Sequence, residues 1–321
     1  MTWPAGARRT ALILALAWLG GGEGVEAQDD PASPLLVFHA GSLRRPFESI
    51  SQAFQAQHPG SPVALESSAS VDAVRKLTDQ GRVPDLLVVA DYGILPRLVV
   101  PRHAGWYVQF ARNAMGLLYT GRSRGAGDLA RDGWWRVLLR DGVRIGMSDP
   151  TRDPAGYRAL LVLALAERHY REPGLAARLR AAIPAEQVRS RASDLVTALA
   201  NGDLDYAFEY RSVAQGEGLR FLALPDSISL GSLELAEAYA GVQVTVDGGS
   251  GRVTYVGEPI VYGLTIPREA PHREAAGAFG RLVLSAAGRA VLEEAGLDPL
   301  FPPAFAGAES PPASLWPPPA Q

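Results

Sequence analysis

The 321-residue chain contains no cysteine, which excludes disulfide bridges, thiol nucleophiles and thiolate metal sites. Lysine is almost absent as well, because Lys76 is the only one and arginine supplies every other cation. The formal net charge is −3, and it stays −3 without residues 1–27, which carry two basic and two acidic side chains. A surface that binds nucleic acid is usually basic, so this balance argues against nucleic acid as a partner. Stability must come from a buried core, for which the chain is long enough.

Two signatures of hydrolytic enzymes are also missing. The chain has no Gly-x-Ser-x-Gly nucleophile elbow and no His-Glu-x-x-His metal-binding helix. Its histidines are scattered singly, and such residues are more often structural or exposed than catalytic: His39, His58, His103, His169 and His272. An exported hydrolase with a serine nucleophile is therefore the weaker alternative, and we expect no enzymatic activity and no cofactor.

Residues 1–27 have the pattern of a cleavable signal peptide. Arg8 and Arg9 precede a short apolar run at residues 11–19, and Val25-Glu26-Ala27 ends a small-residue cleavage pattern near Ala27. The apolar run is short for a membrane span, and without cysteine there is no lipid attachment site. These features predict an exported protein of the periplasm that is not embedded in the membrane.

The stretch from Leu35 to Ser42 predicts a strand that turns directly into a helix. A short apolar run ends in Ala-Gly-Ser, and Phe47, Ile50 and Phe54 then recur at helical spacing. Ser42 is the expected N-cap. Such a turn leaves backbone N–H groups unpaired at the positive end of a helix, which favours an anion. An ordinary β-to-α turn without a ligand is the alternative interpretation.

The same order of elements is repeated in the next segment. Residues 63–66 predict a second strand, and Ser70 is the expected N-cap of a second helix. Residues 86–90 form a continuous apolar run, which is typical of a parallel strand buried on both faces. Because the carboxyl ends of parallel strands lie at one edge of a sheet, we expect the turns at Ser42 and Ser70 to share a site.

A second α/β unit is expected between about residues 121 and 257. Residues 143–147 predict a strand, after which Asp153 fits the N-cap and Pro154 the first position of a long helix. A further helix is expected over residues 193–201. Residues 205–210 then predict a strand in which Glu209 lies on the face opposite three aromatic residues. Taken alone, Glu209 would most simply face solvent from an edge strand.

Two segments, residues 106–119 and 258–267, are expected to cross between the two units. The last helical region is expected over residues 275–295, with an interruption at Gly288. Two crossings between two α/β lobes describe a clamshell with a ligand cleft between them. The predicted domains are a signal peptide at 1–27, lobe 1 at 28–115 plus 259–306, lobe 2 at 116–258 and a Pro-rich, irregular tail at 307–321.

Taken together, these segments resemble the tungstate/molybdate-binding proteins of ABC importers, the tungstate-transport type related to bacterial molybdate-binding proteins. The matching stretches occur in the family's order over nearly all of the chain after residue 27. They are Phe38–Leu43, Ser70–Lys76, Ala90–Tyr92, Trp106–Asn113, Asp153–Arg158, Asp205–Ala214 and Pro259–Pro267.

The resemblance implies an α/β, type II periplasmic-binding-protein fold that holds an oxyanion between its lobes. Its partners would be tungstate or molybdate and the permease of an ABC importer. The implied oxyanion-binding residues are Gly41, Ser42, Ser70, Asp153, Pro154, Ala155 and Glu209. Asp153 and Glu209 match the two carboxylates that reach the tungsten or molybdenum centre itself and raise its coordination from four to six.

The chain departs from the family pattern at two places. Ala155 stands where relatives often have cysteine, which matters little if only its backbone N–H is used. The region from Gly174 to Gln187 is shorter than usual, which leaves an additional donor near Arg191–Ser193 undetermined. A binder of another small oxyanion such as sulfate is the first alternative, and the sequence does not rank tungstate against molybdate.

Overall fold

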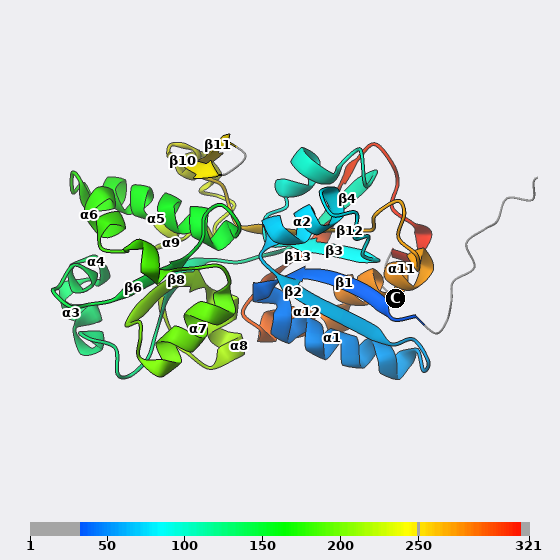
Figure 1. Cartoon of the computed structure of the whole chain (residues 1–321), viewed down its shortest axis with the longest axis horizontal. Coiled ribbons are helices and arrows are strands. Elements are labelled where there is room, and N and C mark those ends of the chain that lie inside the picture. Colours follow the sequence, from blue (N-terminus) through cyan, green and yellow to red (C-terminus); the bar gives the residue numbers. More distant parts are fainter. Residues whose placement is uncertain (1–32, 249–250, 316–321) are drawn as a thin grey trace, which may run out of the picture.

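Two mixed sheets, each covered by helices, form two lobes in a computed structural model that describes residues 33–248 and 251–315 (Figure 1). The predicted signal peptide at residues 1–27 lies outside the described residues, as do the last six residues of the predicted tail. Within the described ranges no single helix is long and apolar enough to span a membrane. One bent pair, α11 (Arg273–Leu284) and α12 (Ala286–Glu294), meets that test by length and composition only.

The sheet of lobe 1 has the strand order β13-β4-β12-β3-β1-β2. Strands β1, β2 and β3 are parallel, whereas β12 pairs antiparallel with both β3 and β4. Its strands are β1 (Leu35–Ala40), β2 (Val63–Ser68), β3 (Leu86–Val89), β4 (Trp106–Arg112), β12 (Val261–Thr265) and β13 (Asp298–Gly307). Its helical segments are η1 (Gly41–Leu43), α1 (Arg44–Gln57), α2 (Ser70–Thr78), η2 (Leu95–Val99), α11 (Arg273–Leu284), α12 (Ala286–Glu294) and η5 (Ala313–Leu315).

The sheet of lobe 2 has the order β7-β6-β8-β5-β9, with β6 parallel to β7 and β8. Its strands are β5 (Met115–Tyr119), β6 (Ile145–Ser148), β7 (Val188–Arg189), β8 (Tyr206–Tyr210) and β9 (Arg220–Ala223), and the hairpin β10 (Gln243–Gly248) and β11 (Gly251–Val256) pairs only with itself. The helical segments are η3 (Ala126–Asp128), α3 (Leu129–Asp132), α4 (Trp134–Leu138), α5 (Pro154–Tyr170), α6 (Leu175–Ala181), η4 (Ala185–Gln187), α7 (Ala192–Asn201), α8 (Arg211–Glu217), α9 (Asp226–Ser229) and α10 (Ala236–Ala240).

The chain passes between the lobes twice. Strand β4 ends in the sheet of lobe 1 and β5 begins in that of lobe 2, so the first passage lies at Asn113 and Ala114. The return runs from β11 to β12, through residues 257–260. A backbone hydrogen bond joins the two passages, because the Asn113 N–H donates to the carbonyl of Ile260 over 3.2 Å. The fold is thus the α/β clamshell of the type II kind that the sequence predicted.

Apolar periodicity predicted the main elements of lobe 1 well. Phe47, Ile50 and Phe54 are at most 1% exposed on the inner face of α1. All residues of β3 are buried, as expected of a parallel strand covered on both faces. The expected interruption of the last helical region at Gly288 was wrong. The break lies at Ser285, whose hydroxyl accepts the Gly288 N–H over 3.1 Å and caps α12.

The segment after α12 also differs from the prediction. Strand β13 was not expected, because three prolines lie within it. It is the outer strand of its sheet and its register with β4 shifts between Pro299 and Ala304, which is where proline is tolerated. The tail beyond Gly307 is irregular up to η5, and Leu315 is fully buried against lobe 1.

Candidate functional site

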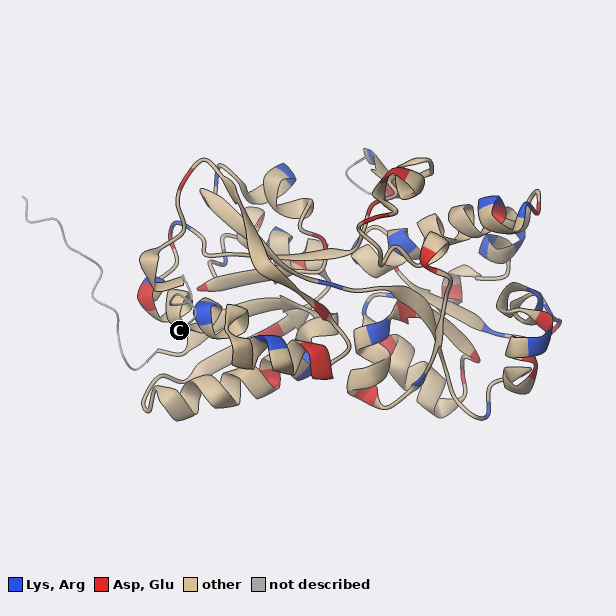
Figure 2. Cartoon of the chain, turned by 180° about the vertical axis from the view of Figure 1, so that it is seen from behind, with Lys and Arg blue, Asp and Glu red and all other residues tan. Residues whose placement is uncertain are grey.

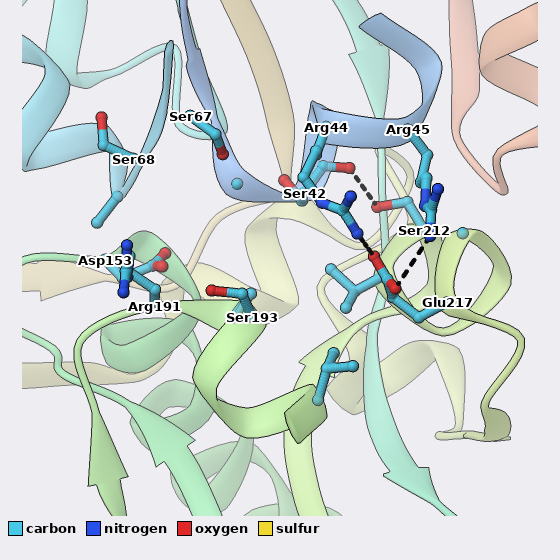
Figure 3. Close-up of a pocket in the computed structure, with 16 residues that line it drawn as sticks. Ser42, Arg44, Arg45, Ser67, Ser68, Asp153, Arg191, Ser193, Ser212 and Glu217 are labelled. Atoms are coloured by element: carbon cyan, nitrogen blue, oxygen red, sulfur yellow. Dashed lines mark hydrogen bonds and ion pairs between the residues drawn. The ribbon is translucent and has the colours of Figure 1, made fainter. Parts of the chain in front are cut away.

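A cavity of about 220 Å³ lies between the lobes, and residues from both lobes face each other across it (Figure 3). Lobe 1 contributes Gly41, Ser42, Arg44, Arg45, Ser67, Ser68 and Ala69, and lobe 2 contributes Asp153, Arg191, Ala192, Ser193, Val196, Ser212, Val213, Gly216 and Glu217. We call this space the cleft cavity. It is smaller than pockets for drug-sized organic ligands, typically 300–1,000 Å³, and therefore fits a small inorganic ion or molecule.

The first residues of several helical segments border the cleft cavity. Gly41 begins η1, Ala69 caps α2, Asp153 caps α5, Ala192 begins α7, and Ser212 lies in the first turn of α8. These segments follow the carboxyl ends of strands, which brings their N-termini to one place. Unpaired N–H groups and the positive ends of helix dipoles at one cavity favour a bound anion.

Ser42 lines the cavity but does not cap a helix. The expectation that it is an N-cap was wrong, since it lies inside η1 and makes no capping bond. Its hydroxyl lies 2.8 Å from the phenolic oxygen of Tyr262. The Asn113 amide donates to that oxygen over 2.9 Å and to the Ser212 hydroxyl over 2.8 Å. A polar network therefore connects the cavity to the first passage between the lobes.

Ser70 does not face the cleft cavity, although the sequence predicted that it shares a site with Ser42. Its hydroxyl accepts the Ala90 N–H over 3.0 Å and holds α2 against the end of β3, so it is not the N-cap and does not line the cavity. Ser67 and Ser68 line the cavity instead, at the end of β2. The Ser68 hydroxyl is buried and has no hydrogen-bond partner within the described part of the chain. Both lie beyond the end of the strand that the sequence predicted at residues 63–66.

Asp153 occupies the predicted place. It caps α5 by accepting the Ala155 N–H over 3.0 Å, and Pro154 takes the first helical position. The carboxylate of Asp153 lines the cleft cavity while the residue is only 7% exposed. Pro154 and Ala155 are buried behind it and do not line the cavity. Burial raises the pKa of Asp153 to about 6.

Glu209 is not on an edge strand, which corrects the simplest interpretation of its sequence position. Strand β8 lies in the middle of its sheet and Glu209 is 0% exposed. Its carboxylate accepts the Tyr210 N–H over 2.9 Å and lies 3.5 Å from the Ser148 hydroxyl. Glu209 lies outside the lining of the cleft cavity. Burial and the neighbouring charge of Asp153 raise its pKa to about 8.

Arg191–Ser193, where the sequence left a donor undetermined, does line the cleft cavity at the start of α7. Among residues 33–248 and 251–315, no group of three or more His, Cys, Asp or Glu side chains could hold a metal ion. Asp153 at the cavity wall and Glu209 behind it are two buried carboxyl groups that lie close enough to repel each other.

The lobes are in contact on both sides of the cleft cavity. On one side Glu217 of α8 pairs with Arg44 and, over 3.6 Å, with Arg45 (Figure 3). On the other side Arg152 pairs with Asp72 of α2 over 2.7 Å, and the Val71 N–H donates to the Arg152 carbonyl over 3.2 Å. The structure is thus that of a closed clamshell.

The family model and the relatives that match this chain are all solute-binding proteins. Residues 35–298 match the family described as bacterial extracellular solute-binding protein. An uncharacterized solute-binding protein of Methanoculleus marisnigri is 42% identical over 291 residues, which cover 84% of this chain and 82% of the relative. The molybdate/tungstate-binding protein WtpA of Pyrococcus abyssi is 35% identical over 323 residues, 92% of each chain.

Solved structures share the fold at low sequence identity. The periplasmic molybdate-binding protein of Azotobacter vinelandii has a TM-score of 0.59 at 18% identity, covering 81% of this chain and 97% of that one. The sulfate-binding protein SubI of Mycobacterium tuberculosis has a TM-score of 0.56 at 18% identity, covering 84% and 88%. At this identity the likeness describes the fold and does not select between anions.

Proposed function

The chain belongs to the family of bacterial extracellular solute-binding proteins, and we propose that it captures tungstate or molybdate in the cleft cavity for delivery to an ABC importer. It is a solute-binding component of ABC-type transport and not an enzyme. The oxyanion would lie between the hydroxyl groups of lobe 1 and the helix starts of lobe 2. The predicted signal peptide is the basis for placing it in the periplasm.

The observation that carries this proposal is the carboxylate of Asp153 at an otherwise anion-favouring cavity. A buried carboxylate repels a dianion such as sulfate, whose central atom accepts no further ligand. A hexavalent tungsten or molybdenum centre differs, because it is a hard ion that accepts carboxylate oxygens directly. Asp153 would supply one such oxygen. Glu209, whose carboxylate is buried outside the cavity lining, would supply the second after its side chain turns toward the cavity.

The remaining groups at the site fit a small tetrahedral oxyanion. Gly41, Ser42, Ser67 and Ser193 bring neutral donors to the cavity. In the proposal Ser70 positions this wall by its bond to the Ala90 N–H. The absence of a buried arginine or lysine from the lining matches recognition by neutral donors and helix dipoles, because the three arginines there have side chains that are 37%, 52% and 61% exposed.

The test is a calorimetric titration of ligand-stripped, refolded protein with tungstate, molybdate and sulfate in turn. Refolding is needed because a tight site can be isolated already filled. We expect tight binding of tungstate or molybdate and no response to sulfate. Asp153→Asn should weaken tungstate binding by at least about tenfold, or 1.4 kcal/mol, because it removes a direct ligand.

The matched control is Asp247→Asn on the β10–β11 hairpin, whose carboxyl is 71% exposed and is not part of the cavity lining. It changes the net charge as Asp153→Asn does and should leave affinity unchanged. If sulfate binds and Asp153→Asn strengthens it, the protein is a binder of simple oxyanions and the coordination by carboxylates is wrong. If none of the three anions binds, the proposal as a whole is wrong.

A further inference from the structure

A second, larger space opens on the cleft cavity at the surface. It measures about 530 Å³ and is lined by Ser67, Ser68, Asp72, Arg75, Lys76, Gln80, Arg152, Ser190, Arg191 and Asp194. We call it the basic groove. Ser67, Ser68 and Arg191 line both spaces, so the groove and the cleft cavity are continuous at these residues. Any small ion that moves through the groove therefore arrives at the hydroxyl groups of lobe 1.

The charge of the basic groove is opposite to that of the whole chain. Four cationic side chains and two carboxylates line it, which leaves a local charge of +2, whereas the chain carries −3. Elsewhere the two signs are mixed, and both lobes in Figure 2 show basic and acidic residues side by side. A dianion is thus repelled by the molecule as a whole and attracted at this groove.

The other side of the cleft cavity offers no such attraction. There Arg44 and Arg45 are matched by Glu48 and Glu217, which pair with both of them. In the groove, Lys76 pairs with Glu66, Arg152 with Asp72 and Arg191 with Asp194. Arg75, by contrast, makes no ion pair with any residue among 33–248 and 251–315. The charge on that side is therefore less neutralised by its neighbours.

Arg191 is the cation that lines both the basic groove and the cleft cavity. Its side chain is 61% exposed, and its contact with Asp194, 3.4 Å long, is a loose one. It is the N-cap residue of α7, beside Ser193, which faces the cavity. An exposed guanidinium at this position attracts an approaching dianion and can swing with it without breaking any buried bond.

From this arrangement we propose that the basic groove is the path by which the anion reaches the cleft cavity, and that Arg75 and Arg191 accelerate its capture electrostatically. The proposal rests on the proposed function and deepens it by assigning residues that act on association and not on the bound state. Fields focused in a groove raise association rates by about 10- to 1,000-fold and are screened by salt over about 8 Å at 0.15 M.

The experiment is stopped-flow mixing of the ligand-free protein with tungstate or molybdate, followed by intrinsic tryptophan and tyrosine fluorescence. Arg75→Gln and Arg191→Gln are combined in one variant. Arg178→Gln and Arg180→Gln on α6 form the control, which makes the same change in net charge outside the groove. We expect the groove variant to associate about tenfold more slowly at low ionic strength, with an unchanged dissociation rate, and to approach the wild type in about 0.5 M salt.

The outcomes separate this inference from the proposed function. Equal slowing in the groove variant and the α6 control would overturn it, because net charge alone would then be responsible. A faster dissociation with unchanged association would also overturn it, since Arg75 or Arg191 would then be a direct contact of the bound anion. If the wild-type protein binds no oxyanion in calorimetry, the proposed function itself has failed before this comparison is made.

Discussion

Two sets of charged contacts join the lobes, and one is buried whereas the other is exposed to solvent. Beside the return passage, Arg158 of lobe 2 donates to the Ala90 carbonyl over 2.6 Å and lies 3.6 Å from Asp91, and Tyr157 also donates to Asp91. Asp91 and Arg158 are each 1% exposed. We call this the buried seam. The rim pairs, Arg152–Asp72 and those of Glu217, keep one partner 37–52% exposed.

The difference in burial predicts which of the two sets of contacts breaks when the lobes move apart. Removing one partner of a buried ion pair leaves a charge uncompensated and costs about 3–5 kcal/mol, whereas an exposed pair contributes about 0–1 kcal/mol. The seam lies next to the return passage, because the Tyr92 N–H beside Asp91 donates to the Val261 carbonyl over 2.9 Å. We therefore expect the lobes to stay joined at the buried seam while the rim pairs break and re-form.

The largest effect is expected from Asp91→Asn. The variant leaves the guanidinium of Arg158 buried without its counter-charge, and we expect the free energy of unfolding to fall by about 3–5 kcal/mol in urea denaturation. Asp247→Asn, at an ion pair on the exposed hairpin, should change it by less than about 0.5 kcal/mol. A loss below about 1 kcal/mol for Asp91→Asn would mean that the buried seam is no stronger than the rim.

Glu209 is a buried carboxyl group whose ionised form we expect to destabilise the ligand-free protein. Its pKa rises from 4.5 to about 8, so between these values the folded state binds a proton that the unfolded state does not. Stability therefore falls as the pH rises through that window, by up to about 1.4 kcal/mol per pH unit. The pKa of Asp153 is also raised, to about 6, so Asp153 adds to the fall at lower pH. Glu209→Gln should remove the part of the fall that lies above about pH 6 and be the more stable protein at pH 8.

The measurement is urea denaturation of both ligand-free proteins across that pH range. When the series is extended below pH 4.5, the two should be closest in stability there, because Glu209 then carries a proton in both the folded and the unfolded state. A wild type that becomes more stable between those pH values would show that another group, not Glu209, controls the pH dependence. Weaker tungstate binding by Glu209→Gln would at the same time support its place as a ligand, a trade of stability for function.

The sequence predicted local structure better than side-chain direction. The strand-to-helix turns after β1 and β2, and the Asp153 cap, followed from apolar spacing and from cap chemistry, both of which are local. Whether Ser42, Ser68 or Ser70 faces the cleft cavity depends on partners far away in sequence. Ser42 meets Tyr262 and Ser70 meets the end of β3, and no spacing rule predicts such contacts.

The position of Glu209 shows the same limit at the level of a sheet. Alternation along residues 205–210 placed Glu209 opposite the aromatic residues but could not say that β8 lies in the middle of its sheet. The strand order depends on β5, which enters from lobe 1 and pairs antiparallel with β8. The pattern of residues alone predicted that Glu209 faces solvent. The resemblance to a known family implied instead that Glu209 lies at the binding site.

A smaller effect is expected from Tyr262→Phe. The phenolic oxygen is the partner of both Ser42 and Asn113, so the change leaves buried polar groups unpaired. We expect a loss of about 1–3 kcal/mol in the free energy of unfolding and weaker oxyanion binding in calorimetry, because Ser42 is no longer held. Tyr107→Phe, at a half-buried tyrosine of β4, is the matched control and should leave affinity unchanged. Unchanged affinity in Tyr262→Phe would show that the network is structural only.

The smallest effect on stability is expected at the rim, from Asp72→Asn. Its partner Arg152 is 43% exposed, and its loss should lower the free energy of unfolding by less than about 1 kcal/mol. The same loss should speed release of the bound anion by about two- to fivefold, because a contact made only in the closed state opposes opening. Glu217→Gln on the opposite side should act additively, as the two pairs share no residue. If Asp72→Asn instead destabilised the protein as much as Asp91→Asn, the lobes could not separate at the rim while remaining joined at the buried seam.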